Sequence, residues 1–414
     1  MTAVTALMPL LAAILTRTGN PEAAIGGYGV ALSVAMFVGL PQLRVQQLTL
    51  VFFDNPISLW QLRKFVGMWV AGVTLVALLV VLPPVTEFLL AKVFSVTGDL
   101  KDNAADALLW LIPLPGLLVL KMHYYGAVYR ISRPRLAWFA TGAGMVTVIA
   151  AAFVLFATDV LQGASIAAAA MTLGTLVETG TLAFLSAGSL RNFDGAGGAG
   201  EVSQKSLVRF FWPLLFAAAL PAGTQPILNA GMARSPEPEV SIAAVAMAFG
   251  IYQLVSVATN GIQNTSLALF ASRYDPFRVR RFALTVGTIT FAVVAVIAYI
   301  PPITSFVIGD IMGADGRLKE MTSTGFRLLS ILPIAMVMEQ VYSAALMRTR
   351  NTRPIVYINV LRLLTLIVWV VATVRFTDLN GLWVGAGAWS LTLFLEAVYA
   401  WIFGRKSLGR VGVV

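Results

Sequence analysis

The sequence of 414 residues contains no cysteine and a single histidine, His123. Without cysteine, the chain has no disulfide and no thiol nucleophile. It also has neither a glycine-rich phosphate loop between a strand and a helix nor the ligand spacing of a metal site. These absences exclude the side-chain sets of the common soluble enzymes, so we expect neither catalysis nor a bound cofactor.

Charged residues are also scarce, at 12% of the sequence, whereas 58% of the residues are hydrophobic. A soluble domain is about one quarter charged, and many of the apolar runs reach the roughly 20 residues that cross a bilayer. The formal net charge is +10, but the basic residues lie between the apolar runs, as in membrane proteins that keep basic loops in the cytoplasm. The composition therefore predicts an integral membrane protein and excludes a nucleic-acid partner.

The apolar runs predict about twelve membrane-spanning helices. The run from Ala3 to Leu15 is about half a span, and we interpret it as the remainder of a truncated first helix. We expect no cleavable signal peptide. The other predicted spans are 24–53, 63–92, 104–129, 134–158, 163–189, 207–232, 239–271, 281–310, 322–348, 353–374 and 380–403.

Basic residues gather in alternate loops, which predicts that both termini are cytoplasmic. The alanine-rich, cysteine-free composition and the short loops favour a bacterial inner membrane. A glycine-rich segment, 191–206 (RNFDGAGGAGEVSQKS), has the composition of a flexible tether. It predicts an N-terminal lobe over 1–190 and a C-terminal lobe over 207–414.

The two lobes align with each other as an internal repeat. Proline pairs, Arg-x-x-Arg-Pro motifs and intramembrane glutamates recur in one order and at almost one offset, which chance similarity between apolar helices does not produce. Six helices per repeat is an even number, so the repeats are predicted to be parallel. The matched segments are Leu82–Thr86 with Ile300–Thr304, Arg130–Pro134 with Arg350–Pro354, and Glu178 with Glu396.

Polar residues recur at helical spacing in the second span of each lobe. The spacing i, i+4, i+7 places each trio on one helix face, and two such stripes could line a cleft between the lobes. The alternative is hydrogen bonding between helices, at roughly 0.6–2 kcal/mol per bond. The trios are Gln42, Gln46 and Thr49, and Thr259, Gln263 and Ser266, with Asn229, Asn260 and Asn264 extending the second stripe.

Ionisable residues within the spans are the other candidates, because each costs about 2.5–3.5 kcal/mol at a helix centre unless it faces a cavity or a partner. Arg44 follows Pro41 by three residues and aligns with Gly261. The repeat therefore does not require Arg44, which favours contact with an anion. The remaining candidates are Lys121 and His123 near the inner membrane surface, Glu178 and Glu396 as structural or ion-coupling acids, and Glu339 with Arg362 as a buried ion pair.

A series of segments, in order along nearly the whole chain, resembles the progressive ankylosis (ANK/ANKH) proteins, a branch of the multidrug/oligosaccharidyl-lipid/polysaccharide (MOP) exporter superfamily. The chain departs from that family at Gln46, Gln225 and Glu339, where basic residues are expected. The matching segments are Tyr28–Val34, Pro41, Leu50–Phe52, Phe211–Leu214, Pro226–Asn229, Arg327–Pro333, Val360–Arg362 and Gly381–Gly387.

The resemblance implies a two-lobed, twelve-helix transporter of the multidrug and toxin extrusion (MATE) type of fold, with a central cleft. It also implies export of small polyanions, such as ATP, pyrophosphate, citrate or other di- and tricarboxylates. We expect a monomer in the lipid bilayer. One alternative is a MATE-type cation or drug antiporter, in which Glu178, Glu339 and Glu396 would take a proton or sodium ion. A lipid-linked flippase and a membrane scaffold without transport activity are further alternatives.

Overall fold

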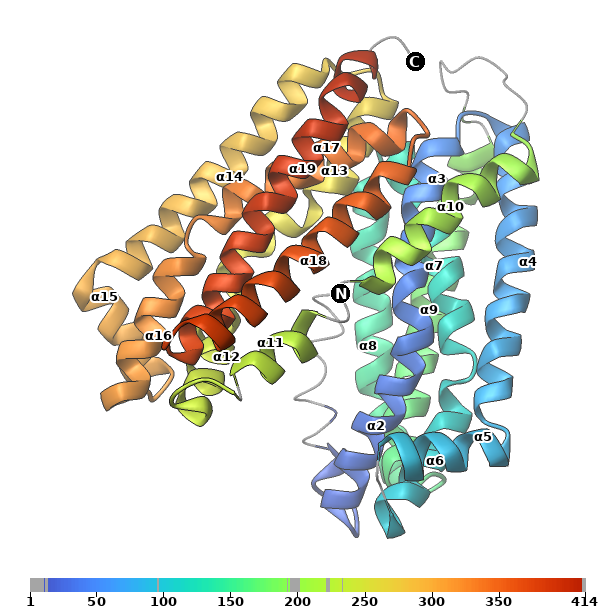
Figure 1. Cartoon of the computed structure of the whole chain (residues 1–414). Helices are drawn as coiled ribbons and strands as arrows, with labels where there is room; N and C mark the ends of the chain where they lie inside the picture. The colour runs from blue at the N-terminus through green and yellow to red at the C-terminus, as the bar shows by residue number, and fades with distance from the viewer. Residues whose placement is uncertain are drawn as a thin grey trace. The chain divides into compact units, whose positions relative to one another are not determined.

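A computed structural model describes residues 11, 14–94, 97–191, 193, 202–220, 224–232 and 234–411. Nearly all of the predicted first helix, Ala3–Leu15, and most of the predicted tether lie outside these residues. All regular elements of the described residues are helical. The chain forms two compact units, Met1–Phe211 (unit 1) and Trp212–Val414 (unit 2), and Figure 1 shows the helices of each unit lying side by side.

Nine helices of the described residues are long and apolar enough to cross a membrane, or ten if α6 and α7, which meet at a 41° bend, form one span. In order, unit 1 contains α2 (Pro21–Gly39), η1 (Leu40–Arg44), α3 (Val45–Phe52), α4 (Pro56–Val80), α5 (Pro83–Glu87), η2 (Phe88–Val93), α6 (Gly98–Leu111), α7 (Leu114–Arg130), α8 (Pro134–Thr158), α9 (Ala164–Arg191) and the start of α10 (Gln204–Ala219).

Unit 2 repeats this order of elements from its second span onward, except that a π-helical turn, η6, precedes its last helix. A 3-10 segment interrupts the second span of both units (η1 and η4), and a π-helical turn follows the short helix that begins at a proline pair (η2 and η5). The elements are α11 (Thr224–Met232), α12 (Pro238–Val255), η4 (Ser256–Gly261), α13 (Ile262–Ala271), α14 (Pro276–Tyr299), α15 (Pro301–Ser305), η5 (Phe306–Ile311), α16 (Gly316–Leu329), α17 (Leu332–Arg348), α18 (Arg353–Phe376), η6 (Trp383–Gly387) and α19 (Ala388–Arg410).

Proline sets several of the helix boundaries, because its fixed φ suits the first helical turn and its missing N–H breaks a continuing helix. Pro56 opens α4 behind a capping box between Asn55 and Ser58. The predicted span 63–92 therefore begins earlier, at Pro56, and ends at Val80, ahead of Pro83. The predicted span 207–232 is likewise two helices, α10 and α11, rather than one.

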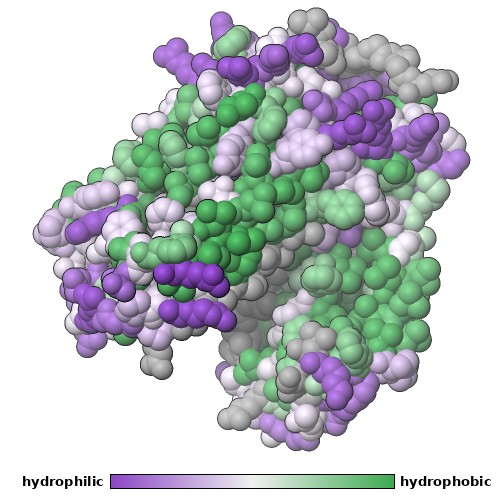
Figure 2. All heavy atoms as spheres, viewed as in Figure 1, coloured by the Kyte–Doolittle hydropathy of each residue, from purple (hydrophilic) through white to green (hydrophobic). Residues whose placement is uncertain are grey.

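Each unit has its own apolar core, and its outer helix faces are apolar as well. In unit 1 the core packs between α2, α6, α7 and α9, and in unit 2 between the corresponding α12, α16, α17 and η6. Leu75, Phe153, Val293 and Val368 are exposed on helices of the two units. Figure 2 shows apolar side chains over the middle of the helices in view and polar ones gathered at the helix ends. This distribution fits helices surrounded by lipid.

A polar contact at equivalent positions joins the start of the second span to the start of α6 in unit 1 and of α16 in unit 2. In unit 1, Asn20 Nδ2 donates to Asp99 Oδ2 over 2.9 Å. In unit 2, Arg317 Nη2 donates to Glu237 Oε2 over 2.8 Å, and Arg317 Nε donates to Glu237 Oε1 over 3.2 Å. The contact is thus present in both units with different groups. The amide of Asn20 corresponds to the carboxylate of Glu237, and the carboxylate of Asp99 to the guanidinium of Arg317.

Two equivalent glycines place these partners. Gly98 and Gly316 have φ values of +59° and +46°, in the left-handed region that glycine adopts without steric cost. Each lies directly before the residue that makes the contact, Asp99 or Arg317. A left-handed turn at each glycine therefore starts α6 and α16 beside the second span of its unit.

The Arg317–Glu237 contact predicts a small acid sensitivity of unit 2. The hydrogen bonds from Arg317 hold the pKa of Glu237 below its ordinary value. The contact therefore stabilises the fold above the ordinary glutamate pKa, and this contribution is lost as pH falls through the lowered pKa. We expect the melting temperature of the wild type to exceed that of Arg317→Gln by about 1–2 °C at pH 6 and by less at pH 3. Equal differences at both pH values in a thermal unfolding series would contradict this.

Candidate functional site

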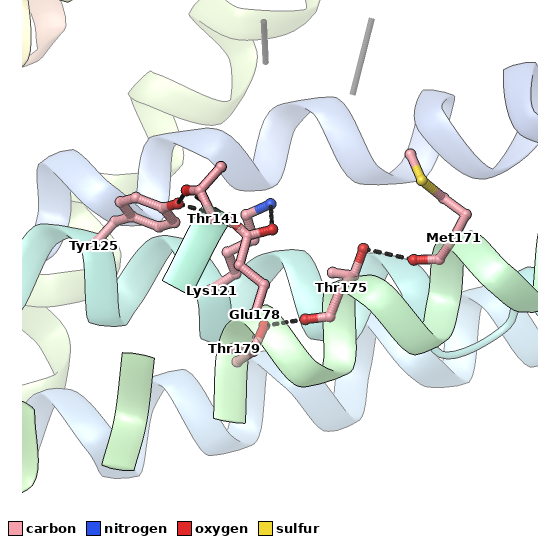
Figure 3. Close-up of polar contacts among 7 residues, drawn as sticks. All are labelled: Lys121, Tyr125, Thr141, Met171, Thr175, Glu178 and Thr179. Carbon is pink, nitrogen blue, oxygen red and sulfur yellow. Dashed lines mark hydrogen bonds and ion pairs between the residues drawn. The ribbon is translucent and has the colours of Figure 1, made fainter. Parts of the chain in front are cut away.

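A buried polar cluster connects three membrane helices of unit 1. Lys121 and Tyr125 come from α7, Thr141 from α8 and Glu178 from α9, and their polar ends converge (Figure 3). Lys121 Nζ donates to Glu178 Oε2 over 2.6 Å, and the two side chains are 10% and 9% exposed. Tyr125 Oη donates to Glu178 Oε1 over 2.6 Å, and Thr141 Oγ1 to the same oxygen over 3.2 Å. Three donors thus surround one carboxylate.

The helix spacing at this cluster depends on glycine. A Cβ added at Gly144 would lie 2.7 Å from the Cβ of Glu178 and 3.0 Å from the carbonyl oxygen of Gly174. Both distances are too short for a side chain, so α8 approaches α9 closely at this level, as small residues allow in membrane helices. The close approach brings Thr141 within reach of Glu178.

The predicted polar stripe of unit 1 bonds largely within its own unit. Thr49 Oγ1 lies 3.0 Å from Nδ1 of His123 on α7, and both side chains are buried. Trp69 Nε1 donates to Gln42 Oε1 over 2.6 Å, and Gln42 Nε2 donates to the carbonyl oxygen of Val38 over 3.0 Å. Gln46 is buried. These contacts are the interhelical and local bonds of the alternative interpretation of the stripe.

Arg44 differs from this stripe in exposure. Its side chain is half-buried at the end of the 3-10 segment η1, directly before α3. Arg44 Nη1 donates to Oε1 of Gln47, a neutral amide, over 3.2 Å. The guanidinium is therefore positioned at the break in the second span.

Unit 2 also pairs its buried acid on the last helix with a cation. Arg362 Nη1 of α18 lies 3.4 Å from Glu396 Oε2 of α19, and Arg362 Nη2 donates to Thr224 Oγ1 of α11 over 3.3 Å. The predicted Arg362–Glu339 pair is thus replaced by Arg362–Glu396. Glu339 on α17 instead accepts a 2.6 Å hydrogen bond from Ser343 one helical turn away.

The second stripe is more exposed than the first. Asn229 and Asn260 are exposed, and Gln263 and Asn264 are half-buried. The backbone N–H of Gln263 donates to Oε1 of Gln340 on α17 over 2.9 Å. Thr259 and Ser266 are buried, and Thr259 Oγ1 donates to the carbonyl oxygen of Ser256. The side chain of Gln225 lies outside the described residues.

Three solved structures illustrate what the chain resembles. A MATE structure in the bent conformation has a TM-score of 0.78 and 16% identity, covering 99% of this chain and 92% of that one. A MOP superfamily transporter from Pyrococcus furiosus has a TM-score of 0.75 and 15% identity, with coverage of 99% and 93%. The Vibrio cholerae MATE transporter VcmN in the bent form has a TM-score of 0.73 and 15% identity, with coverage of 100% and 94%. This chain has the MATE fold.

The predicted fold class is thereby confirmed: a membrane protein of many helices with the MATE fold. No protein-family model matches the sequence. No curated protein matches it either. Among the residues described, no group of three or more His, Cys, Asp or Glu side chains could hold a metal ion.

Within this MATE fold, sequence reasoning missed several partners of the predicted residues. Tyr125 and Thr141 were not predicted at the Glu178 site, because a lone hydroxyl in an apolar helix carries no signal of its own. Asp54 and Arg130 were not predicted to be partners either. They form a 3.0 Å ion pair in which the Arg130 side chain is 5% exposed.

Proposed function

We propose that the chain is a membrane transporter that exports small polyanions by alternating access. ATP, pyrophosphate, citrate and other di- and tricarboxylates are the substrate class implied by the resemblance to the progressive ankylosis proteins. The membrane helices and the MATE fold support a transporter. The alternation of basic loops supports a multi-pass location in a bacterial inner membrane with cytoplasmic termini, and we include a monomeric state in the proposal.

The charged residues within the spans of unit 1 support an anionic substrate. The ionisable candidates within the spans of this unit are two cations, one acid and one histidine: Arg44, Lys121, Glu178 and His123. Glu178 is neutralised by Lys121 at 2.6 Å, so the pair adds no net charge. The other cation of these spans is Arg44, a half-buried group at a helix break. A guanidinium in a medium of low dielectric constant attracts carboxylate and phosphate groups strongly.

Outward movement of such an anion needs no coupled ion. An inside-negative membrane potential drives each negative charge outward by about 2.3 kcal/mol per 100 mV. Facilitated export is therefore sufficient on energetic grounds.

A cation antiporter is the second candidate, and the charges of unit 2 favour it. The mid-span ionisable residues there are Glu339, Arg362 and Glu396, two acids and one cation. Glu396 is paired with Arg362, whereas Glu339 accepts a hydrogen bond from the neutral Ser343 and is our candidate for taking a proton or sodium ion. The Pyrococcus furiosus transporter is described as having a binding pocket of reversed polarity that suggests a different function. The fold is therefore compatible with a substrate of either charge.

Efflux from proteoliposomes tests the proposal. We expect wild-type protein to release labelled citrate and ATP, and Arg44→Gln to reduce that efflux by about tenfold to a hundredfold, the loss of one charge-assisted contact of roughly 1.5–3 kcal/mol. Arg44→Lys is the matched control, which keeps the charge and should retain most of the efflux.

A cationic dye in the same vesicles separates the two candidates. Dye movement without anion efflux, abolished by Glu339→Gln and unaffected by Arg44→Gln, would overturn the anion proposal in favour of the antiporter.

A further inference from the structure

The first half of α10 is fixed to unit 1. Gln204 Nε2 donates to the carbonyl oxygen of Gln61 over 3.0 Å and to its side-chain Oε1 over 3.2 Å. Further along, the ring of Phe210 lies edge-on to that of Phe52 at 5.2 Å. The buried ring of Phe211 lies edge-on to Trp69 at 5.2 Å and to Phe65 at 5.9 Å. Hydrogen bonds and aromatic packing thus hold about two turns of α10 against α3 and α4.

The other end of the glycine-rich segment is fixed to unit 1 as well. The ring of Phe193, two residues beyond α9, lies 5.1 Å from the ring of Phe53. The guanidinium of Arg130 lies over the ring of Phe193, 5.2 Å from its centre. Arg130 is in turn paired with Asp54. The segment predicted to connect two lobes therefore begins and ends on the same unit.

The boundary between the units falls inside α10, between Phe211 and Trp212. The next residue is Pro213, which lies within the helix. A proline at an interior position removes one backbone hydrogen bond and crowds the carbonyl of the preceding turn, so it is the point at which a helix bends most readily. The weakest turn of α10 thus coincides with the place where the chain passes from one unit to the other.

We propose that the turn of α10 around Pro213 is the hinge between the two units, and that the glycine-rich segment 191–206 is not. This inference rests on the proposed transport by alternating access, which requires one unit to move relative to the other. It replaces the sequence-based expectation of a flexible tether, because a tether with both ends on one unit transmits no motion between units. A bend in the part of this turn that follows Phe211 leaves the Gln61, Phe52 and Trp69 contacts in place.

A cross-link tests the position of the hinge. The natural chain has no cysteine, so Gln61→Cys with Gln204→Cys creates the only two thiols, and a short bismaleimide joins them. We expect citrate and ATP efflux of the cross-linked protein to remain within about twofold of the unlinked double variant. A protease site placed at 196–199 reports the cross-link, because linked fragments stay together on a denaturing gel. Efflux that the cross-link abolishes would overturn the proposal, since the first half of α10 would then have to leave unit 1.

Pro213→Ala tests the hinge itself and restores the missing hydrogen bond. We expect a several-fold slower efflux, whereas Pro134→Ala, in the first turn of α8 where proline interrupts no bond, should change efflux little. Spin labels at Arg135→Cys in unit 1 and Arg353→Cys in unit 2 report motion without any substrate.

The label distances also separate failure of the hinge from failure of the proposed function. Pro213→Ala should narrow the distribution of distances between the two spin labels, and an unchanged distribution would overturn the proposed hinge. A narrowed distribution in a protein that moves no anion would keep the hinge and reject anion transport.

Discussion

Replacing Lys121 with methionine is expected to destabilise unit 1 by about 3–5 kcal/mol, because it leaves the Glu178 carboxylate buried without its cation. The two side chains are 10% and 9% exposed and their charged atoms lie 2.6 Å apart, so water cannot replace the lost ammonium. Tyr125 and Thr141 still donate to the carboxylate but carry no charge. The measurement is thermal unfolding in detergent, where a loss of this size corresponds to roughly 10 °C for a unit of about 200 residues.

The double variant Lys121→Met/Glu178→Leu is the control for this effect. Removing both charges together leaves no buried ion, and such replacements of a whole pair are often neutral or stabilising. We expect the double variant to recover most of the lost stability. A double variant as unstable as Lys121→Met would show that packing of the lysine stem, rather than the charge, accounts for the loss.

Gly144→Val is expected to cost about 2–3 kcal/mol, because the new side chain would meet groups that cannot move aside cheaply. Its Cβ alone would lie 2.7 Å from the Cβ of Glu178 and 3.0 Å from the backbone oxygen of Gly174. Relieving the clash requires α8 to move away from α9, which also withdraws Thr141 from Glu178. Unfolding midpoints in detergent measure the loss.

Gly142→Val is the matched control on the same helix. A Cβ at Gly142 would meet nothing within 4 Å, so we expect a stability within about 0.5 kcal/mol of the wild type, as for other surface substitutions. Similar losses in both variants would show that valine weakens α8 through helix propensity rather than through contact with α9.

The fold was predictable because its signals are long-range and redundant. The prediction rests on many apolar runs of span length and on repeated proline motifs, such as Leu82–Thr86 with Ile300–Thr304. An error in the assignment of any one helix therefore does not change the predicted fold. The helix breaks were harder to predict. The π-helical turns η2 and η5 follow the proline pairs, but no residue pattern marks a π turn in an apolar helix. The split of 207–232 into α10 and α11 carries no comparable proline pair.

The site was predictable residue by residue but not contact by contact. An ionisable residue inside an apolar helix is conspicuous, so Lys121, Glu178, Arg362 and Glu396 were all found. Which cation meets which acid depends on helix packing and rotation, which one sequence does not specify. Arg362 therefore pairs with Glu396 on the adjacent α19 rather than with Glu339.

The equivalent acids of the two units take their cations from different helices, and this constrains how the repeat diverged. Glu178 is neutralised from α7 by Lys121, and Glu396 from α18 by Arg362. The position equivalent to Lys121 in unit 2 is Glu339, because α7 and α17 have the same length, begin with Leu-Pro and end at an arginine. After duplication, a direct exchange of one cation for the other would have passed through a unit with an uncompensated acid. A route without that loss passes through a unit that carries both cations at once, so that the acid keeps a partner while the other cation is replaced.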